Sequence, residues 1–210
     1  RMLYSQGIAL ESLGIRRKDG VAVETDYRKI FRIFASHYHL FRGTPSRMWL
    51  DHVFSEVFGF TQALSAATAD HYYDAINAQL VLPEFKPRTL LDRFNIELLA
   101  TTEGALNSLS HHAALKGTGY DKKVITTFRP DDVVDADRAD FAANVAKLAE
   151  LTGQDTQSWQ GYLQALRLRR QFFREHGATA TDHGHPTAKT ADLTPTEAAA
   201  LFSRCLAGSA

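Results

Sequence analysis

The feature that most constrains this chain is an apolar strand–helix–strand pattern in residues 94–132. Residues 96–101 form a mostly apolar run, residues 106–115 keep helical spacing, and residues 123–128 form a second β-rich run that stops at Arg129. Apolar strands joined through a helix favour a parallel sheet covered by helices, with right-handed crossovers. In such sheets the ligand-binding residues lie at the carboxyl ends of the strands. We therefore expect any functional site at the ends of these two runs.

The residues before this pattern are helical in period. One apolar stripe runs from Tyr27 to Phe41, with Thr25 or Asp26 as the capping residue. Thr44 followed by Pro45 opens a second helix, and a third is predicted over residues 69–80. This region is rich in aromatic residues, so we expect it to pack against another part of the protein.

The residues after the pattern predict more helices and one further strand. Helices are predicted over 140–151 and from Trp159 to a stop at Gly177. Residues 178–182 are a short strand candidate, and the capping box that starts at Thr194 begins a last helix. Three β/α units do not close a barrel, which needs about eight strands. We therefore expect the chain to be part of a larger fold, as its start at Arg1 rather than Met also indicates.

Composition narrows the class of protein. The chain has 210 residues, is 44% hydrophobic, and balances 24 Lys and Arg against 24 Asp and Glu. This balance predicts no basic surface for nucleic acid and no membrane-binding tail. A single cysteine, Cys205, suits a reducing compartment. The sequence therefore predicts a soluble cytoplasmic protein without nucleic-acid or membrane partners.

Polar residues at the two strand ends are the first site candidates. Arg129 could hold a carboxylate or phosphate through a bidentate contact, or form a structural salt bridge with Asp131 or Asp132, and the sequence leaves both open. Thr101 to Glu103 could bind hydroxyl groups or cap the following helix, and capping is the commoner role.

Histidines near the third strand candidate are the second set. Asp182, His183 and His185 offer one oxygen and two imidazoles within four residues, and zinc accepts all of these ligands. A loop that carries histidines for other reasons is the alternative. Other histidine pairs lie in helical patterns, where their side chains do not share a face: His37 with His39, and His111 with His112.

Several strings together resemble the uronate isomerases of the amidohydrolase superfamily. They are FNIELLATTEGALNSLSHHAAL, KVITTFRPDDVVD and ATATDHGHP, while RMLYSQGI and DHVFSEVFGF resemble the helical insertion of that family. The resemblance implies an α/β fold, a partial (β/α)8 barrel covering about strands 2–4 with a large N-terminal helical insertion. The implied regions are the insertion at 1–92, a barrel segment at 93–193 and the helix after strand 4 at 194–210.

The resemblance also implies an activity, the aldose–ketose isomerisation of D-glucuronate to D-fructuronate and of D-galacturonate to D-tagaturonate in uronic acid catabolism. Its residues carry over to Arg129, Thr102, Glu103, Asp182 and His183 as uronate-binding groups. A divalent metal, usually zinc, is implied, with its main ligands and the catalytic residues expected upstream of Arg1 and downstream of Ala210. His183 and His185 are the weak metal candidates within the chain.

Two alternatives stay open at this point. One is an amidohydrolase-type metal hydrolase, and the other is a non-catalytic binding module on the same fold. Assembly into a homo-oligomer is also open. If the resemblance holds, the isolated segment is expected to be inactive, because the metal site would be missing.

Overall fold

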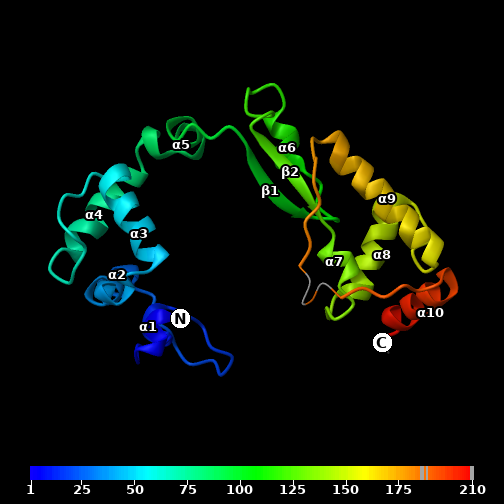
Figure 1. Cartoon of the computed structure of the whole chain (residues 1–210), viewed down its shortest axis with the longest axis horizontal. Coiled ribbons are helices and arrows are strands. Elements are labelled where there is room, and N and C mark those ends of the chain that lie inside the picture. The colour runs from blue at the N-terminus through cyan, green and yellow to red at the C-terminus, as the bar shows by residue number, and fades with distance from the viewer. Residues whose placement is uncertain (185–186, 188, 209–210) are drawn as a thin grey trace. The chain divides into compact units, whose positions relative to one another are not determined.

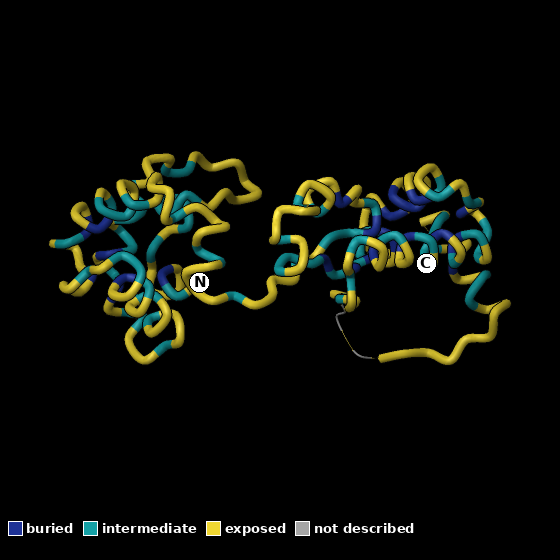
Figure 2. The backbone as a smooth tube through the Cα atoms, turned by 90° about the horizontal axis from the view of Figure 1, so that it is seen from above, coloured by how far each residue is buried: buried dark blue, intermediate teal, exposed yellow. Residues whose placement is uncertain are grey.

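The computed structural model describes residues 1–184, 187 and 189–208 and divides into two compact units, Arg1–Asn95 and Ile96–Ala210 (Figure 1). Each unit has its own buried segments, drawn dark blue in Figure 2. The boundary at 193/194 that we expected within the second unit stays a prediction. In the described part of the chain, no helix combines the length and apolar character needed to cross a membrane.

The first unit consists of helices joined by turns and loops. The Asp26 carboxylate accepts the N–H groups of Arg28 and Lys29, and the Thr44 hydroxyl accepts that of Arg47, which confirms both predicted helix starts. The predicted helix over 69–80 is also confirmed. The elements are α1 (Met2–Ser5), η1 (Glu11–Leu13), α2 (Tyr27–Ser36), η2 (Tyr38–Phe41), α3 (Pro45–His52), the π-helix η3 (Val53–Val57), α4 (Ala69–Leu80), η4 (Pro83–Phe85) and α5 (Pro87–Arg93).

The stripe from Tyr27 to Phe41 is two elements rather than the single helix that its period suggests. The helix α2 ends at Ser36, and the His37 ring nitrogen Nδ1 lies 2.8 Å from the Ile33 carbonyl oxygen. The chain then tightens into the 3₁₀ turn η2. Its aromatic side chains join a core of buried and partly buried residues formed by Phe31, Phe34, Ala35, Tyr38, Phe41, Leu50, Phe54, Phe60, Leu64, Ala69, Tyr72 and Ile76.

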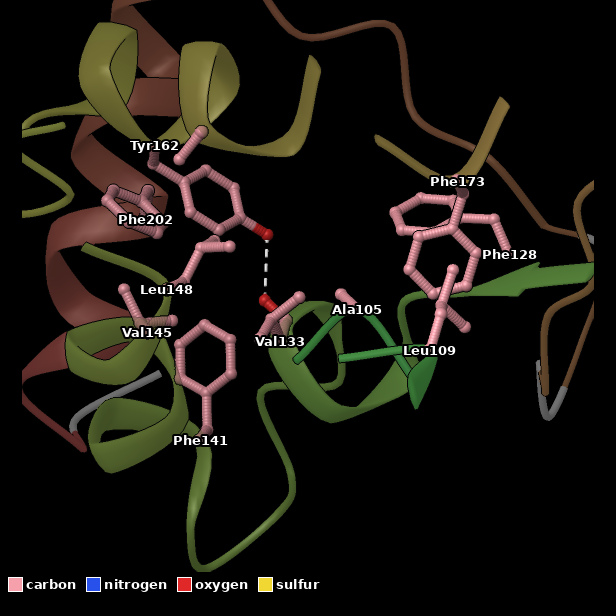
Figure 3. Close-up of a cluster of buried hydrophobic side chains, with 11 residues drawn as sticks. Ala105, Leu109, Phe128, Val133, Phe141, Val145, Leu148, Tyr162, Phe173 and Phe202 are labelled. Carbon is pink, nitrogen blue, oxygen red and sulfur yellow. Dashed lines mark hydrogen bonds between the residues drawn. The ribbon is translucent and has the colours of Figure 1, made fainter. Parts of the chain in front are cut away.

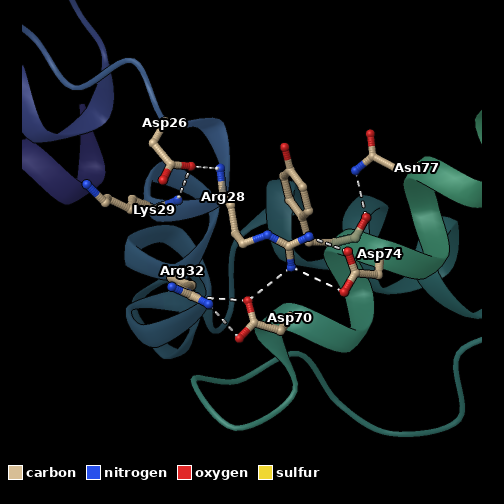
Figure 4. A network of polar contacts seen from close by, with 8 residues as sticks. Asp26, Arg28, Lys29, Arg32, Asp70, Asp74 and Asn77 are labelled. Carbon is tan, nitrogen blue, oxygen red and sulfur yellow. Dashed lines mark hydrogen bonds and ion pairs between the residues drawn. The ribbon is translucent and has the colours of Figure 1, made fainter.

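An arginine–aspartate network ties α2 to α4 on the surface of this unit (Figure 4). Arg32 contacts Asp70 through Nε and Nη2, at 2.8 and 2.9 Å. Arg28 binds both Asp70 and Asp74, and its guanidinium lies 4.5 Å from the centre of the Tyr73 ring. These pairs hold two helices of the first unit together.

In the second unit the strands β1 (Leu99–Gly104) and β2 (Val124–Arg129) are parallel and pair in register from Leu99↔Val124 to Gly104↔Arg129. The strand β1 therefore lies further along the chain than the predicted range of 96–101. Thr101, Thr102 and Glu103 are strand residues, so the expectation that they cap the next helix is wrong. β-branched threonines suit a pleated strand, and here they pair with Thr126 and Thr127.

The third strand candidate forms a single parallel bridge, Phe128↔Thr181, rather than a strand. The Phe128 N–H donates to the Ala180 carbonyl at 3.2 Å, and the Asp182 N–H donates to the Phe128 carbonyl at 3.0 Å. Because β2 pairs with both neighbours, it lies between β1 and the segment 180–182. The three carboxyl ends therefore lie at one edge.

The helices of the second unit, within its described residues, are α6 (Ser110–Leu115), α7 (Asp131–Val134), α8 (Phe141–Thr152), α9 (Trp159–Glu175) and α10 (Pro195–Leu206). The capping box of Thr194 and Glu197 is confirmed, and α8 ends at Gly153 with φ of +67°. The helix α6 starts later than predicted, because residues 105–109 form a turn. The core packs α8, α9 and α10 together around Val145, Leu148, Tyr162 and Phe202, and places Phe173 against Phe128 (Figure 3).

The helices cover one face of the strand pair. His112 of α6 contacts Thr101, and Phe173 of α9 packs against Phe128 with ring centres 4.9 Å apart. Because side chains alternate along a strand, the paired residues Thr101, Glu103, Thr126 and Phe128 share this covered face. Ala100, Thr102, Thr127 and Arg129 share the opposite, more open face, on which Ala100 and Thr102 are exposed.

Candidate functional site

Arg129 ends β2 on the open face and lies between two carboxylates. Its Nε is 3.0 Å from Asp131 Oδ2 and 3.6 Å from Asp182 Oδ2, and its side chain is 40% exposed. Nε itself is enclosed, and within the described residues its contact with Asp131 is an ion pair without hydrogen-bond geometry. A guanidinium has five N–H donors in a fixed fork, so an ion pair through Nε is compatible with a second anion at the outer nitrogens.

Asp131 links Arg129 to the segment after the Thr181 bridge. Its Oδ2 accepts the Gly184 N–H at 2.9 Å, and its Oδ1 lies 3.7 Å from His183 Nδ1. A Cβ on Gly184 would lie only 3.0 Å from the same Oδ2, so the chain passes close to the carboxylate here. The structure thus brings Arg129, Asp182 and His183 together around Asp131, which sequence reasoning had treated only as a salt-bridge partner.

Thr102 and Glu103 point to opposite faces of β1. Thr102 shares the open face with Arg129. Glu103 lies on the covered face, where it accepts the Thr126 hydroxyl and its Oε1 is 3.8 Å from His112 Nε2. The same His112 nitrogen lies 3.0 Å from Thr101 Oγ1.

This covered-face set was missed because His112 had been considered only as a partner of His111. The signal was present in the sequence, since a period of two places Thr101 and Glu103 on one face and Thr126 on the matching face of the next strand. Thr126 is fully buried, so its hydroxyl needs a partner, and the Glu103 carboxylate provides it.

Of the two histidines predicted as metal candidates, the structure describes His183. His183 lies beside Asp131 and Asp182, while His185 lies outside the described residues. Within the part of the chain that the structure describes, no group of three or more His, Cys, Asp or Glu side chains is arranged to hold a metal ion. The described donors therefore do not fit a metal centre by themselves.

Arg129 and Thr102, on the open face, can therefore bind a ligand that carries both an anionic group and hydroxyl groups. A guanidinium oriented by a carboxylate contacts planar oxyanions in a bidentate manner, and the Thr102 hydroxyl can donate to or accept from a sugar hydroxyl. Carboxylate and hydroxyl groups together are what a sugar acid presents.

Residues 9–210 match the family model described as glucuronate isomerase. The chain belongs to this family. The match covers both units and confirms the resemblance that the strand-end strings indicated.

Curated uronate isomerases match along almost the whole chain. The uronate isomerase of Xanthomonas oryzae pv. oryzae (strain MAFF 311018) is 53% identical over 210 residues, which is 100% of this chain and 44% of that protein. The uronate isomerase of Phenylobacterium zucineum (strain HLK1) is 56% identical over 206 residues, 98% of this chain and 43% of that protein. The chain thus spans less than half the length of the curated relatives it matches.

Solved structures show that the same fold extends to distant members. The crystal structure of glucuronate isomerase from Caulobacter crescentus has a TM-score of 0.91 at 55% identity and covers 100% of this chain and 44% of its own. The crystal structure of uronate isomerase from Thermotoga maritima has a TM-score of 0.80 at 25% identity. The match covers 95% of this chain and 44% of that one.

Proposed function

We propose that this chain supplies the uronate-binding edge of an enzyme that interconverts D-glucuronate and D-fructuronate, and D-galacturonate and D-tagaturonate. The observation that carries the proposal is the position of Arg129, at the carboxyl end of β2 and beside Asp131, in a chain of the glucuronate isomerase family. A sugar acid offers the carboxylate for which such an arginine is suited.

The proposed architecture is a (β/α)8 barrel of the amidohydrolase superfamily. In this arrangement β1, β2 and segment 180–182 are neighbouring strands 2, 3 and 4, and their helix-covered face is the outside of the barrel. Their parallel order and one-sided helical cover support it. The open face with Thr102 and Arg129 would then line the interior, and residues 1–92 would be the insertion between strands 1 and 2.

The site residues have different proposed roles. Arg129 holds the uronate carboxylate, and Asp131 orients its guanidinium. Thr102 contacts a sugar hydroxyl from the neighbouring strand, and Asp182 and His183 contact the substrate from the third strand end. Glu103, which the resemblance also implied as a binding residue, has its carboxylate on the covered face with Thr126, so we assign it no contact with the substrate.

The proposed reaction is an internal redox exchange within the sugar. A proton leaves C2 and one is returned to C1, so that C1 is reduced from aldehyde to alcohol and C2 is oxidised from alcohol to ketone. A divalent metal, zinc by resemblance, would polarise the sugar oxygens. Because the described residues do not assemble a metal site, we assign to them binding and orientation only. We propose a cytoplasmic enzyme of uronic acid catabolism.

The test is an isomerase assay in deuterated water with protein produced at the length of its curated relatives and carrying this chain. We expect D-glucuronate to give D-fructuronate. Deuterium at C1 would show that the transferred proton exchanges with solvent, and protium there would show direct transfer from C2 to C1. A hydrolase would leave the uronate unchanged and cleave an amide or ester substrate instead. Absence of fructuronate with substrate in excess would contradict the proposal.

A further inference from the structure

The turn between β1 and α6 has no regular structure, yet the residues at its two ends are buried. Ala105 and Leu109 are 0% and 1% exposed, and Leu109 has φ of +55°, a conformation that a leucine side chain rarely adopts. The Leu109 N–H donates to the Asn107 side chain at 2.7 Å. The buried backbone groups at these ends need hydrogen-bond partners, since water cannot reach them freely.

Two side chains of opposite charge provide those partners. The Asp132 carboxylate accepts the Ala105 and Leu106 N–H groups at 3.1 and 3.3 Å. The Arg169 guanidinium donates to the Ala105 and Asn107 carbonyl oxygens, both at 2.7 Å. We call Asp132 and Arg169 the turn clamp. It binds both the donors and the acceptors of one short turn, from α7 on one side and α9 on the other.

The clamp uses a buried charge, which indicates a role beyond packing. Arg169 is 7% exposed, and burial lowers its pKa while the charge of Asp132 opposes the shift. A buried guanidinium costs free energy unless its donors are satisfied, and an apolar side chain would pack α9 more simply. Its hydrogen bonds go to the turn rather than to a carboxylate, so the charge serves to fix backbone.

The clamp also requires a close approach of the two strand ends. A Cβ on Gly104 would lie 2.6 Å from Asp132 Oδ2, so a residue larger than glycine would push the carboxylate away. Gly104 pairs in register with Arg129, and Asp132 follows Arg129 by one turn of chain. The clamp therefore joins the carboxyl end of β1 to that of β2, directly beside Arg129.

We infer that Asp132 and Arg169 are positioning residues for uronate binding, because they set the separation of Thr102 on β1 from Arg129 on β2. This inference rests on the proposed function. Neither residue contacts the substrate. Loss of the clamp shifts the turn after β1 and moves one strand end relative to the other. Binding of the sugar acid then weakens, while the chemical step, which depends on other groups, proceeds at its former rate.

The test compares kinetics of Arg169→Ala and Arg169→Lys with a matched control, in protein produced at the length of the curated relatives. The control, Tyr162→Phe, removes another buried hydrogen bond of this unit, from the Tyr162 hydroxyl to the Val133 carbonyl of α7, and keeps both clamp side chains. We expect Arg169→Ala to raise KM for D-glucuronate about tenfold, with kcat changed less than about threefold. The lysine of Arg169→Lys can reach only one of the two carbonyl oxygens, so we expect its KM to lie between those of wild type and Arg169→Ala. We expect millimolar guanidinium ion to lower the raised KM of Arg169→Ala toward the wild-type value and to leave the KM of Tyr162→Phe unchanged.

Equal KM values for Arg169→Ala and the control, or a fall in kcat with unchanged KM, would overturn the inference while the proposed function stands. A wild-type protein that does not isomerise uronates contradicts the proposed function instead. In that case, amide hydrogen exchange tests whether the clamp holds the turn, because this measurement needs no enzyme activity. Asp132→Asn should speed exchange of the Ala105 and Leu106 amides about tenfold or more, and leave the Tyr162 amide unchanged. Unchanged exchange at Ala105 and Leu106 would show that the clamp does not hold the turn.

Discussion

Asp131 and Arg129 form an ion pair within the turn that ends β2, with 3.0 Å between Oδ2 and Nε. The same carboxylate accepts the Gly184 N–H, so a single side chain connects the ends of β2 and of segment 180–182. Its neighbour Asp132 connects the end of β2 to the turn after β1. Two consecutive aspartates thus tie all three strand ends at the edge where we place the substrate.

Asp131→Asn tests whether this ion pair orients the arginine. Asparagine still offers an oxygen to the Gly184 N–H but loses the charge that faces Arg129. We expect KM for D-glucuronate to rise about three- to tenfold with kcat nearly unchanged, as for a group that acts on binding alone. Steady-state kinetics measure this, with the exposed Asp137→Asn as control. Identical KM values in the two variants would show that Asp131 does not orient Arg129.

Glu103→Ala tests the contact behind the sheet. The fully buried Thr126 hydroxyl would lose its acceptor, and leaving a buried polar group without a partner lowers the free energy of unfolding by about 1–3 kcal/mol. Glu103→Gln should lower the free energy of unfolding less, because the glutamine amide oxygen can still accept the Thr126 hydroxyl. Urea unfolding measures both, and the exposed Glu97→Ala serves as control. A loss no larger than the control's would mean that Thr126 does not depend on Glu103.

Asp70→Asn tests the surface network of the first unit and its pH dependence. Hydrogen bonds from Arg32, and then from Arg28, hold the Asp70 pKa below its usual 3.8. A lowered folded pKa means that the contribution is present above pH 3.8 and is lost as the pH falls through the folded value. The wild-type protein should therefore be the more stable at pH 7, and the two proteins should converge below the folded pKa.

Salt offers a second check on Asp70, because exposed pairs are screened. Thermal unfolding at low and high ionic strength should show a smaller difference between wild type and Asp70→Asn at high salt. The exposed Asp121→Asn is a suitable control. A difference that persists at the lowest pH would assign the effect to packing rather than to charge.

The helices of this chain could be predicted because their signals are local. Thr44 followed by Pro45, the Asp26 cap and the Thr194 capping box act within one turn of helix, and each was confirmed. The period of residues 69–80 likewise matched α4.

The strand ends were harder, because their limits depend on partners far along the chain. The run at 96–101 is apolar, yet pairing with β2 draws Thr102 to Gly104 into the strand. The turn at 105–109 was assigned to a helix, since nothing local reveals that Asp132 and Arg169 would bind its backbone. The run at 178–182 has strand composition but pairs only at Thr181.

The candidate site shows the same division. Arg129, Asp182 and His183 were singled out from the sequence, and the structure brings them together, because Arg129 ends β2 and the other two follow the Thr181 bridge at the same edge. Glu103 and Thr102 point to opposite faces because side chains alternate along a strand. This follows only once β1 is known to extend through Glu103. Asp131 as a shared partner required the fold, because 53 residues separate it from Gly184.

The most direct test of the account is the KM of D-glucuronate for wild type and Arg129→Met, in protein produced at the length of the curated relatives. Arg138→Met is the matched control, since Arg138 also pairs with a nearby aspartate, Asp140, at 2.9 Å. We predict that wild type isomerises glucuronate, that Arg129→Met raises KM about 10–100-fold, and that the control changes it less than about twofold. Equal KM values for Arg129→Met and wild type would contradict the assignment of the uronate carboxylate to Arg129.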